Sequence, residues 1–187
     1  TRLCRAMRVL VVTNDFPPAI GGIQSYVRDF VDEIVRREGP DSVVVFASTP
    51  SKEEAAAWDA AHAYTVVRWP HYFLLPTVRV TRKMQELIRT HNIDTVWFGA
   101  AAPFAVMGAA AKRAGASRIV ASTHGHEVGW SIVPGARRSL QRIGKHADTI
   151  TYISNFTLER LKGAFGQDPD FVALPSGVDT NFFRPAE

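Results

Sequence analysis

The sequence has one cysteine, Cys4, among 187 residues, so no disulfide can form within the chain. No apolar run is long enough to cross a bilayer, and the first residues lack the apolar core and cleavage site of a secretory signal. These absences oppose secreted and membrane-spanning classes. We expect a cytoplasmic protein.

Several catalytic motifs are also absent. There is no G-x-G-x-x-G dinucleotide loop, no Walker lysine and no G-x-S-x-G elbow, which argues against the common nucleotide-binding and serine-hydrolase classes. Potential metal ligands gather only at His124, His126 and Glu127. These three lie within four loop residues and match no familiar zinc spacing, so no metal is predicted.

The charge of the chain is positive, at +4, with an isoelectric point near 9.5. That balance suits nucleic acid, an anionic membrane or a phosphate-bearing substrate equally well. Aromatic residues do not alternate with basic ones, and no recognition-helix, RRM or KH signature is present. A nucleic-acid partner is therefore not predicted.

Strand-like and helix-like patterns alternate along the chain. Continuous apolar runs favour buried strands, and apolar residues at helical spacing favour covering helices. Strands are expected at 8–13, 42–47, 65–68, 95–98, 118–123, 149–153 and 171–173, and helices at 23–38, 53–62, 77–91, 103–114, 135–146 and 154–165. This order predicts an α/β fold with a Rossmann-like parallel sheet and helices on both faces.

Ligands of open α/β sheets bind beyond the carboxyl ends of the strands, and one such end here carries a glycine pair. Gly21 and Gly22 end the loop 14–22 and precede a helix, where free backbone N–H groups favour anions. The alternative is that the two glycines form a simple turn into the helix.

Two further strand ends carry polar residues. His124 follows the strand at 118–123 and could hydrogen-bond a sugar hydroxyl or share a proton, unless its ring only satisfies loop backbone groups. Ser154 suits the N-cap of the helix at 154–165, and Ser154 or Asn155 could also line a cleft.

Four motifs, in order, resemble one enzyme family. The segments RVLVVTNDFPPAIGGIQSYV, STHGHE, ISNFT and LPSGVDTNFFRP are similar to the opening loop, the later cleft motifs and the interdomain linker of the retaining GT-B glycosyltransferases. More narrowly, GGIQSY and THGHEVGW resemble the bacterial phosphatidylinositol-mannoside mannosyltransferases, which use GDP-mannose. The resemblance covers residues 7–187.

The resemblance implies roles for individual residues. Gly21 and Gly22 would meet the donor diphosphate through backbone N–H groups, and Gln24 would contact the acceptor head group. His124 would lie against the transferred sugar as the catalytic residue of this half. Asn14, Asp15, Ser154 and Asn155 would line the cleft. The diphosphate itself would help to deprotonate the acceptor, so no metal or other cofactor is expected.

The resemblance also divides the chain. Residues 1–6 are expected to be an upstream extension, 7–174 an N-terminal, acceptor-side domain, and 175–187 the start of an interdomain linker. The donor-binding C-terminal domain would be absent, so the chain alone is expected to be inactive.

A basic helix suggests a membrane partner. Arg79, Arg82 and Lys83 follow the apolar segment 69–76, a combination that suits an enzyme at the inner face of the plasma membrane. The alternative is a solvated helix face, which is the favoured interpretation for a second basic cluster on 135–146.

The leading hypothesis is thus half of a transferase that moves mannose from GDP-mannose to a phosphatidylinositol mannoside at the membrane. Two alternatives stay open: a related glycosyltransferase with another acceptor, and a free-standing, non-catalytic module that binds phosphate or membrane. The length of the native reading frame would separate the module from the transferases.

Overall fold

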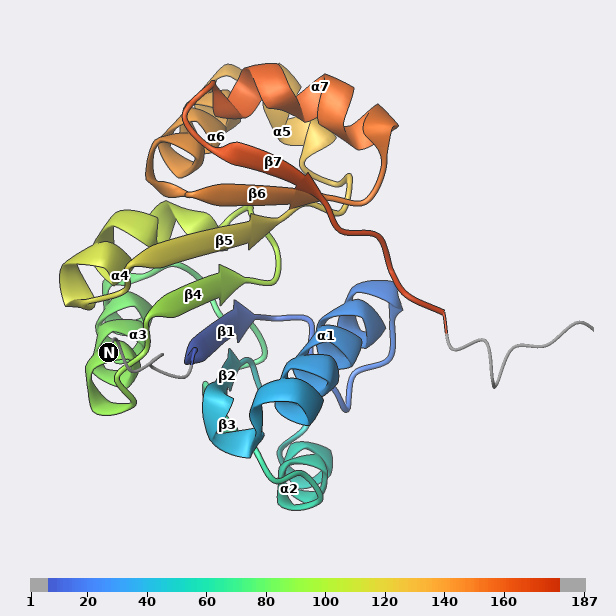
Figure 1. Ribbon diagram of the computed structural model, residues 1–187, viewed down its shortest axis with the longest axis vertical. Helices are drawn as coiled ribbons and strands as arrows, with labels where there is room; N and C mark the ends of the chain where they lie inside the picture. The colour runs from blue at the N-terminus through green and yellow to red at the C-terminus, as the bar shows by residue number, and fades with distance from the viewer. Residues whose placement is uncertain (1–6, 179–187) are drawn as a thin grey trace, which may run out of the picture.

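A computed structural model describes residues 7–178 (Figure 1). The expected upstream extension at 1–6 and residues 179–187 of the expected linker lie outside these described residues. Within residues 7–178, no helix combines the length and the apolar character needed to cross a bilayer.

Seven parallel strands form one sheet in the order β3-β2-β1-β4-β5-β6-β7. They are β1 (Val9–Thr13), β2 (Val43–Ala47), β3 (Thr65–Arg68), β4 (Thr95–Phe98), β5 (Arg118–Ser122), β6 (Thr149–Tyr152) and β7 (Asp170–Ala173). Every residue of β1 and β2 is buried, as their continuous apolar runs predict.

Helices cover both faces of the sheet (Figure 1). The elements are α1 (Gly22–Glu38), α2 (Lys52–Ala60), α3 (Val78–Thr90), α4 (Gly108–Ala114), α5 (Val128–Ile132), α6 (Pro134–His146) and α7 (Asn155–Phe165), with 3₁₀ turns η1 (Pro40–Ser42) and η2 (Phe104–Met107). Side chains of α3, α4, α6 and α7 share one apolar core, whereas α1 and α2 pack on the opposite face. The predicted fold class is confirmed.

The structure differs from the sequence prediction in local detail. The helix expected at 103–114 begins as η2 and becomes α-helical only at Gly108. The short helix α5 was not predicted, because five residues are too few for a clear periodic pattern. In the apolar segment 69–76, Leu74 is buried but Leu75 is 53% exposed.

Helices α6 and α7 approach each other closely at Gly144. A Cβ placed on Gly144 would lie only 1.8 Å from the carbonyl oxygen of Phe165, which is backbone and cannot rotate away. Glycine is therefore required here by packing. On α7, Gly163 has open space where a Cβ would project.

These two glycines give a matched test of the packing. Gly144→Ala should lower the free energy of unfolding by about 2 to 3 kcal/mol, because the added methyl group forces the helices apart. Gly163→Ala should change it by less than about 1 kcal/mol. Urea denaturation followed by circular dichroism would compare them, and equal effects would show that the α6–α7 contact is not tight.

Candidate functional site

Polar groups converge where β1, β4 and β5 end at the carboxyl edge of the sheet. Beneath this edge, the hydroxyl of Ser122 accepts hydrogen bonds from Trp97 Nε1 and Thr151 Oγ1, both at 2.8 Å. Ser122 and Thr151 are buried, as is Thr13 at the end of β1. These buried groups have their hydrogen-bond partners, so they form a rigid layer beneath the loops that carry the predicted site residues.

The ring of His124 is held between two neighbours. Its Nε2 lies 2.6 Å from the carbonyl oxygen of Gly99, and Tyr26 packs edge-on against the ring with centroids 5.0 Å apart. A carbonyl can only accept, so Nε2 carries the hydrogen. In the neutral ring Nδ1 is then the acceptor, and it can take a hydrogen bond from a substrate hydroxyl.

Gly99 is a site residue that sequence reasoning missed. A Cβ on Gly99 would lie 3.0 Å from both Cβ and Oγ1 of Thr13 and 3.2 Å from Val27 Cγ2. A side chain here would push the carbonyl away from His124. Its position directly after the strand at 95–98 is the one signal that the sequence offers.

Glu127 holds the histidine loop in place. Its carboxylate is fully buried, and Oε2 accepts the backbone N–H groups of His124 and Gly125, each at 3.1 Å. Oε1 lies 3.3 Å from Nε2 of His126, whose side chain is 45% exposed. Among the described residues, no group of three or more His, Cys, Asp or Glu side chains is arranged to hold a metal ion.

Asp15 and Gln24 meet across the glycine loop. Gln24 Nε2 donates to Asp15 Oδ1 at 3.0 Å, so its side chain folds over Gly21, where an added Cβ would lie 2.2 Å from Gln24 Oε1. Burial raises the pKa of Asp15, and protonation of His124 or His126 opposes that rise. The sequence-predicted Asp15, Gln24 and His124 therefore share one site.

The first turn of α1 faces this site with free backbone groups. Gly21 is its N-cap, and no side chain caps the helix. Its unpaired N–H groups and the helix dipole favour an anion. The protein's own packing does not require glycine at Gly22, since a Cβ there would meet nothing within 4 Å. The predicted diphosphate contact of both glycines stays a prediction.

The remaining predicted cleft residues have structural partners. The side-chain amide of Asn14 donates to Leu74 O at 3.2 Å and accepts from Leu74 N at 2.7 Å, so it ties loop 14–22 to the segment before α3. Ser154 caps α7 by accepting from Thr157 N at 3.3 Å, which confirms the predicted N-cap. Asn155 is exposed at the first position of α7.

The residues predicted to contact a membrane lie on α3, at its N-terminal end and on its outer side. Arg79 and Arg82 are exposed, whereas Lys83 pairs with Glu86 at 2.7 Å. Just before the helix, Tyr72 and Phe73 are each 62% exposed. A substantial apolar surface therefore precedes the basic helix.

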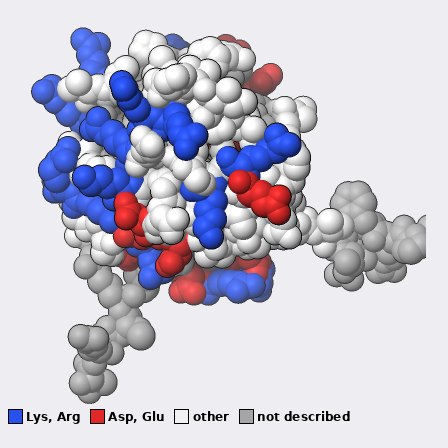
Figure 2. Space-filling model, turned by 90° about the horizontal axis from the view of Figure 1, so that it is seen from above, with Lys and Arg blue, Asp and Glu red and all other residues white. Residues whose placement is uncertain are grey.

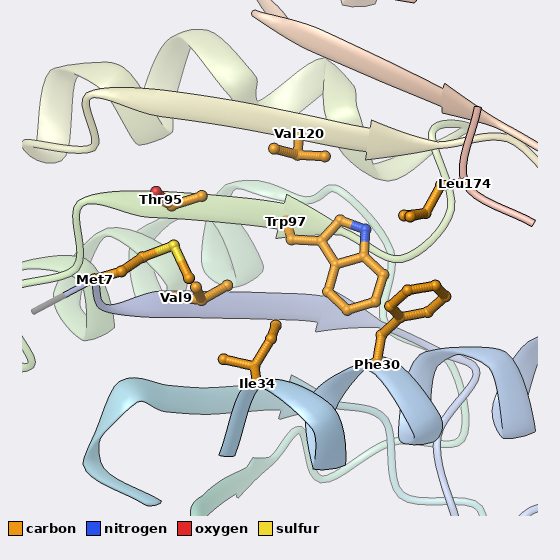
Figure 3. Close-up of a pocket in the computed structure, with 8 residues that line it drawn as sticks. All are labelled: Met7, Val9, Phe30, Ile34, Thr95, Trp97, Val120 and Leu174. Atoms are coloured by element: carbon orange, nitrogen blue, oxygen red, sulfur yellow. The ribbon is translucent and has the colours of Figure 1, made fainter. Parts of the chain in front are cut away.

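A separate hollow of about 170 Å³ lies on the α1 face of the sheet (Figure 3). Its lining consists of Met7, Val9, Phe30, Ile34, Thr95, Trp97, Val120 and Leu174. These side chains offer almost no hydrogen-bonding groups, since Trp97 Nε1 is already bonded to Ser122. The hollow is therefore unsuited to a phosphate or a sugar.

The residues 20–182 match the family described as Glycosyltransferase Family 4. The chain belongs to this family. It is 58% identical over 179 residues to the GDP-mannose-dependent monoacylated alpha-(1-6)-phosphatidylinositol monomannoside mannosyltransferase of Corynebacterium glutamicum. It is 51% identical over 180 residues to the GDP-mannose-dependent alpha-(1-6)-phosphatidylinositol monomannoside mannosyltransferase of Mycolicibacterium smegmatis.

These comparisons cover 96% and 95% of the family 4 chain but 46% of each relative, so the chain spans about half their length. Solved structures agree on the fold. HepE of Anabaena, in complex with UDP and glucose, superposes with a TM-score of 0.68 at 16% identity, covering 96% of this chain and 47% of HepE. The resemblance to the GT-B glycosyltransferases is confirmed, and the chain corresponds to their N-terminal part.

The raised pKa of Asp15 predicts a pH-dependent gain in stability on substitution. Because the pKa of Asp15 is raised in the folded state, the stability that its protonated carboxyl contributes is fully present below the unfolded pKa of 3.8. That contribution is lost as the pH rises through the folded-state pKa. At pH 7 the buried charge therefore costs stability. Asp15→Asn keeps an oxygen for Gln24 and removes that charge.

We expect Asp15→Asn to unfold at a higher urea concentration than the parent at pH 7, with the difference narrowing as the pH falls toward about 4. Asp168→Asn, at an exposed turn, is the matched control and should show no such gain. A gain for Asp15→Asn that is the same at every pH would contradict the assignment.

Proposed function

We propose that the chain is the acceptor-side half of a retaining glycosyltransferase that transfers mannose from GDP-mannose to a phosphatidylinositol mannoside. The observation that carries this proposal is the 58% identity, over 96% of the chain, to a mannosyltransferase of that donor and acceptor class. The convergence of His124, Asp15 and the α1 N-terminus supplies a site with suitable chemistry.

In the proposed reaction, the bond between the mannose anomeric carbon and the diphosphate oxygen breaks, and a bond to the acceptor oxygen forms on the same face. The acceptor proton passes to the departing diphosphate. The N–H groups at Gly21 and Gly22 would stabilise the negative charge there. Nδ1 of His124 would accept a hydrogen bond from a mannose hydroxyl, with Gly99 and Tyr26 fixing the ring.

Acceptor recognition would fall to the Asp15–Gln24 pair. Their 3.0 Å hydrogen bond presents an amide and a carboxylate beside the loop, and both groups suit the hydroxyls of an inositol ring. Ser154 and Asn155 would border the cleft from the start of α7. The proposed reaction requires neither a metal nor another cofactor.

The acceptor is a lipid, so the site would work at a membrane surface. The exposed Tyr72 and Phe73 with Arg79 and Arg82 suit contact with an anionic leaflet. We place the protein at the inner face of the plasma membrane as a peripheral enzyme. Lys83 would contribute less than the two arginines, because Glu86 already neutralises it.

The decisive assay supplies the full-length protein with GDP-mannose, UDP-glucose or UDP-N-acetylglucosamine, together with lipid or soluble acceptors. We expect transfer from GDP-mannose to phosphatidylinositol mannoside and none by residues 7–178 alone. Transfer from a UDP-sugar instead, or to another acceptor, would favour a related family 4 enzyme. No transfer from any donor would favour a binding module.

His124→Ala in the full-length protein should lower kcat at least about 100-fold, because the contact to the reacting sugar is lost. His91→Ala is the matched control, since His91 lies just after α3 at the opposite edge of the sheet. Circular dichroism would confirm that both variants fold. An unchanged kcat for His124→Ala would remove this residue from the mechanism.

A further inference from the structure

The segment that connects β5 to β6 has an unusual charge composition. Residues 128–146, which include α5 and α6, contain four Lys or Arg residues and no Asp or Glu. The four are Arg137, Arg138, Arg142 and Lys145. A solvated helix in a soluble protein usually mixes both signs, as α1 does with its Glu33–Arg36 and Glu33–Arg37 pairs.

All four basic residues project from one side of α6. At 100° per residue they fall within about 140° of the helix circumference, and all four are exposed. The buried Leu140 and Ile143 lie on the opposite side. Figure 2 looks onto the α5–α7 end of the molecule and shows basic side chains gathered over one part of it.

These charges are almost unused inside the protein. The ion pairs found within residues 7–178 include none of the four, and only Arg137 makes a weak hydrogen bond, to Gly163 O at 3.4 Å. The tight contact at Gly144 holds α6 against α7, so the basic side is presented by a fixed helix.

Apolar side chains protrude at the N-terminal end of the same helix. Ile132 is 78% exposed and Val133 55% exposed, at the bend between α5 and α6. Phe156 on neighbouring α7 is 62% exposed, and the Arg160 guanidinium lies 4.2 Å from its ring centroid. Aliphatic and aromatic groups exposed beside a basic face are characteristic of proteins that bind lipid interfaces.

We propose that this elbow surface, defined as Ile132 and Val133 with the basic side of α6, docks on an anionic phospholipid bilayer. The basic residues would contact lipid phosphates while Ile132 and Val133 enter the boundary of the acyl chains. The inference extends the proposed function, because it adds a second lipid-contact region to the α3 surface. Its test measures binding and does not depend on turnover.

Two features favour a bilayer over a nucleic acid. A nucleic acid offers phosphates but no hydrocarbon for Ile132 and Val133, and these branched side chains are poor stacking platforms for bases. The elbow surface also lies on the same sheet face as α3, because α3 and α6 share one core. Both helices begin at the carboxyl edge of parallel strands, so one bilayer can meet both.

The test is sedimentation of the full-length protein with sucrose-loaded vesicles of pure phosphatidylcholine, or of phosphatidylcholine with about 30% phosphatidylglycerol. We expect Arg138→Gln with Arg142→Gln to weaken binding to the anionic vesicles about tenfold or more, since each basic residue near a charged surface contributes about fivefold. Arg36→Gln with Arg37→Gln, on α1 at the opposite face of the sheet, removes the same net charge and should change binding less than twofold.

Ile132→Ser with Val133→Ser should weaken anionic-vesicle binding about tenfold and leave its salt dependence unchanged, because the lost contribution is apolar. Equal losses for the α6 pair and its control would overturn the proposal in favour of a general net-charge effect. The proposal would also be overturned if the α6 variant and the Ile132–Val133 variant both bound fully and only Arg79→Gln with Arg82→Gln lost binding. That result would favour docking through α3 alone.

Mannosyl transfer to detergent-dispersed acceptor, measured on the same variants, separates this inference from the proposed function. The elbow variants should retain the parent's rate there, because their substitutions lie outside the proposed site. If the parent transfers no mannose but binds vesicles through the elbow surface, the proposed function is refuted and the docking surface is supported. A parent protein that does not bind anionic vesicles would refute the docking surface itself.

Discussion

The direction in which the chain winds reverses between β1 and β4, and the arrangement of the site depends on this reversal. From β1 the chain proceeds to β2 and β3 with α1 and α2 on one face. It then returns to β4 and continues outward to β7 with the later helices on the other face. Loops from the adjoining ends of β1 and β4 therefore diverge to opposite faces and leave room for a ligand between them.

Stability and function compete at this edge. Burial of the Asp15 carboxyl at this edge raises its pKa, so the fold bears an electrostatic cost at neutral pH. Glu127 is the contrasting case, because two backbone N–H groups compensate its burial and order the loop. One carboxylate stabilises the site and the other is kept there at the expense of stability.

Much of the fold was predictable because its elements carry strong local signals. Buried runs such as 8–13 and 42–47 favour central strands, and their alternation with long amphipathic helices favours parallel connections. The histidine loop was found because it directly follows such a run, and the glycine pair because it ends the loop between such a run and a helix. The short α5 had no comparable signal.

Contacts between distant segments were not predictable. The pairing of His124 with Gly99 joins two strand ends 25 positions apart, and Asn14 is bonded to Leu74 across 60. Nothing local distinguishes Gly99 from an ordinary glycine after a strand, or Asn14 from a residue that faces a ligand. These assignments depend on strand order, which the sequence pattern leaves open.

Tyr26 links the histidine loop to the end of the sheet. Its ring packs against His124, and its hydroxyl donates to the carbonyl of Leu174 at 2.8 Å, where the chain leaves β7. A displacement of the chain beyond β7 must therefore either break this hydrogen bond or shift the ring beside His124. Tyr26 therefore connects the position of the exit segment physically to the orientation of the histidine.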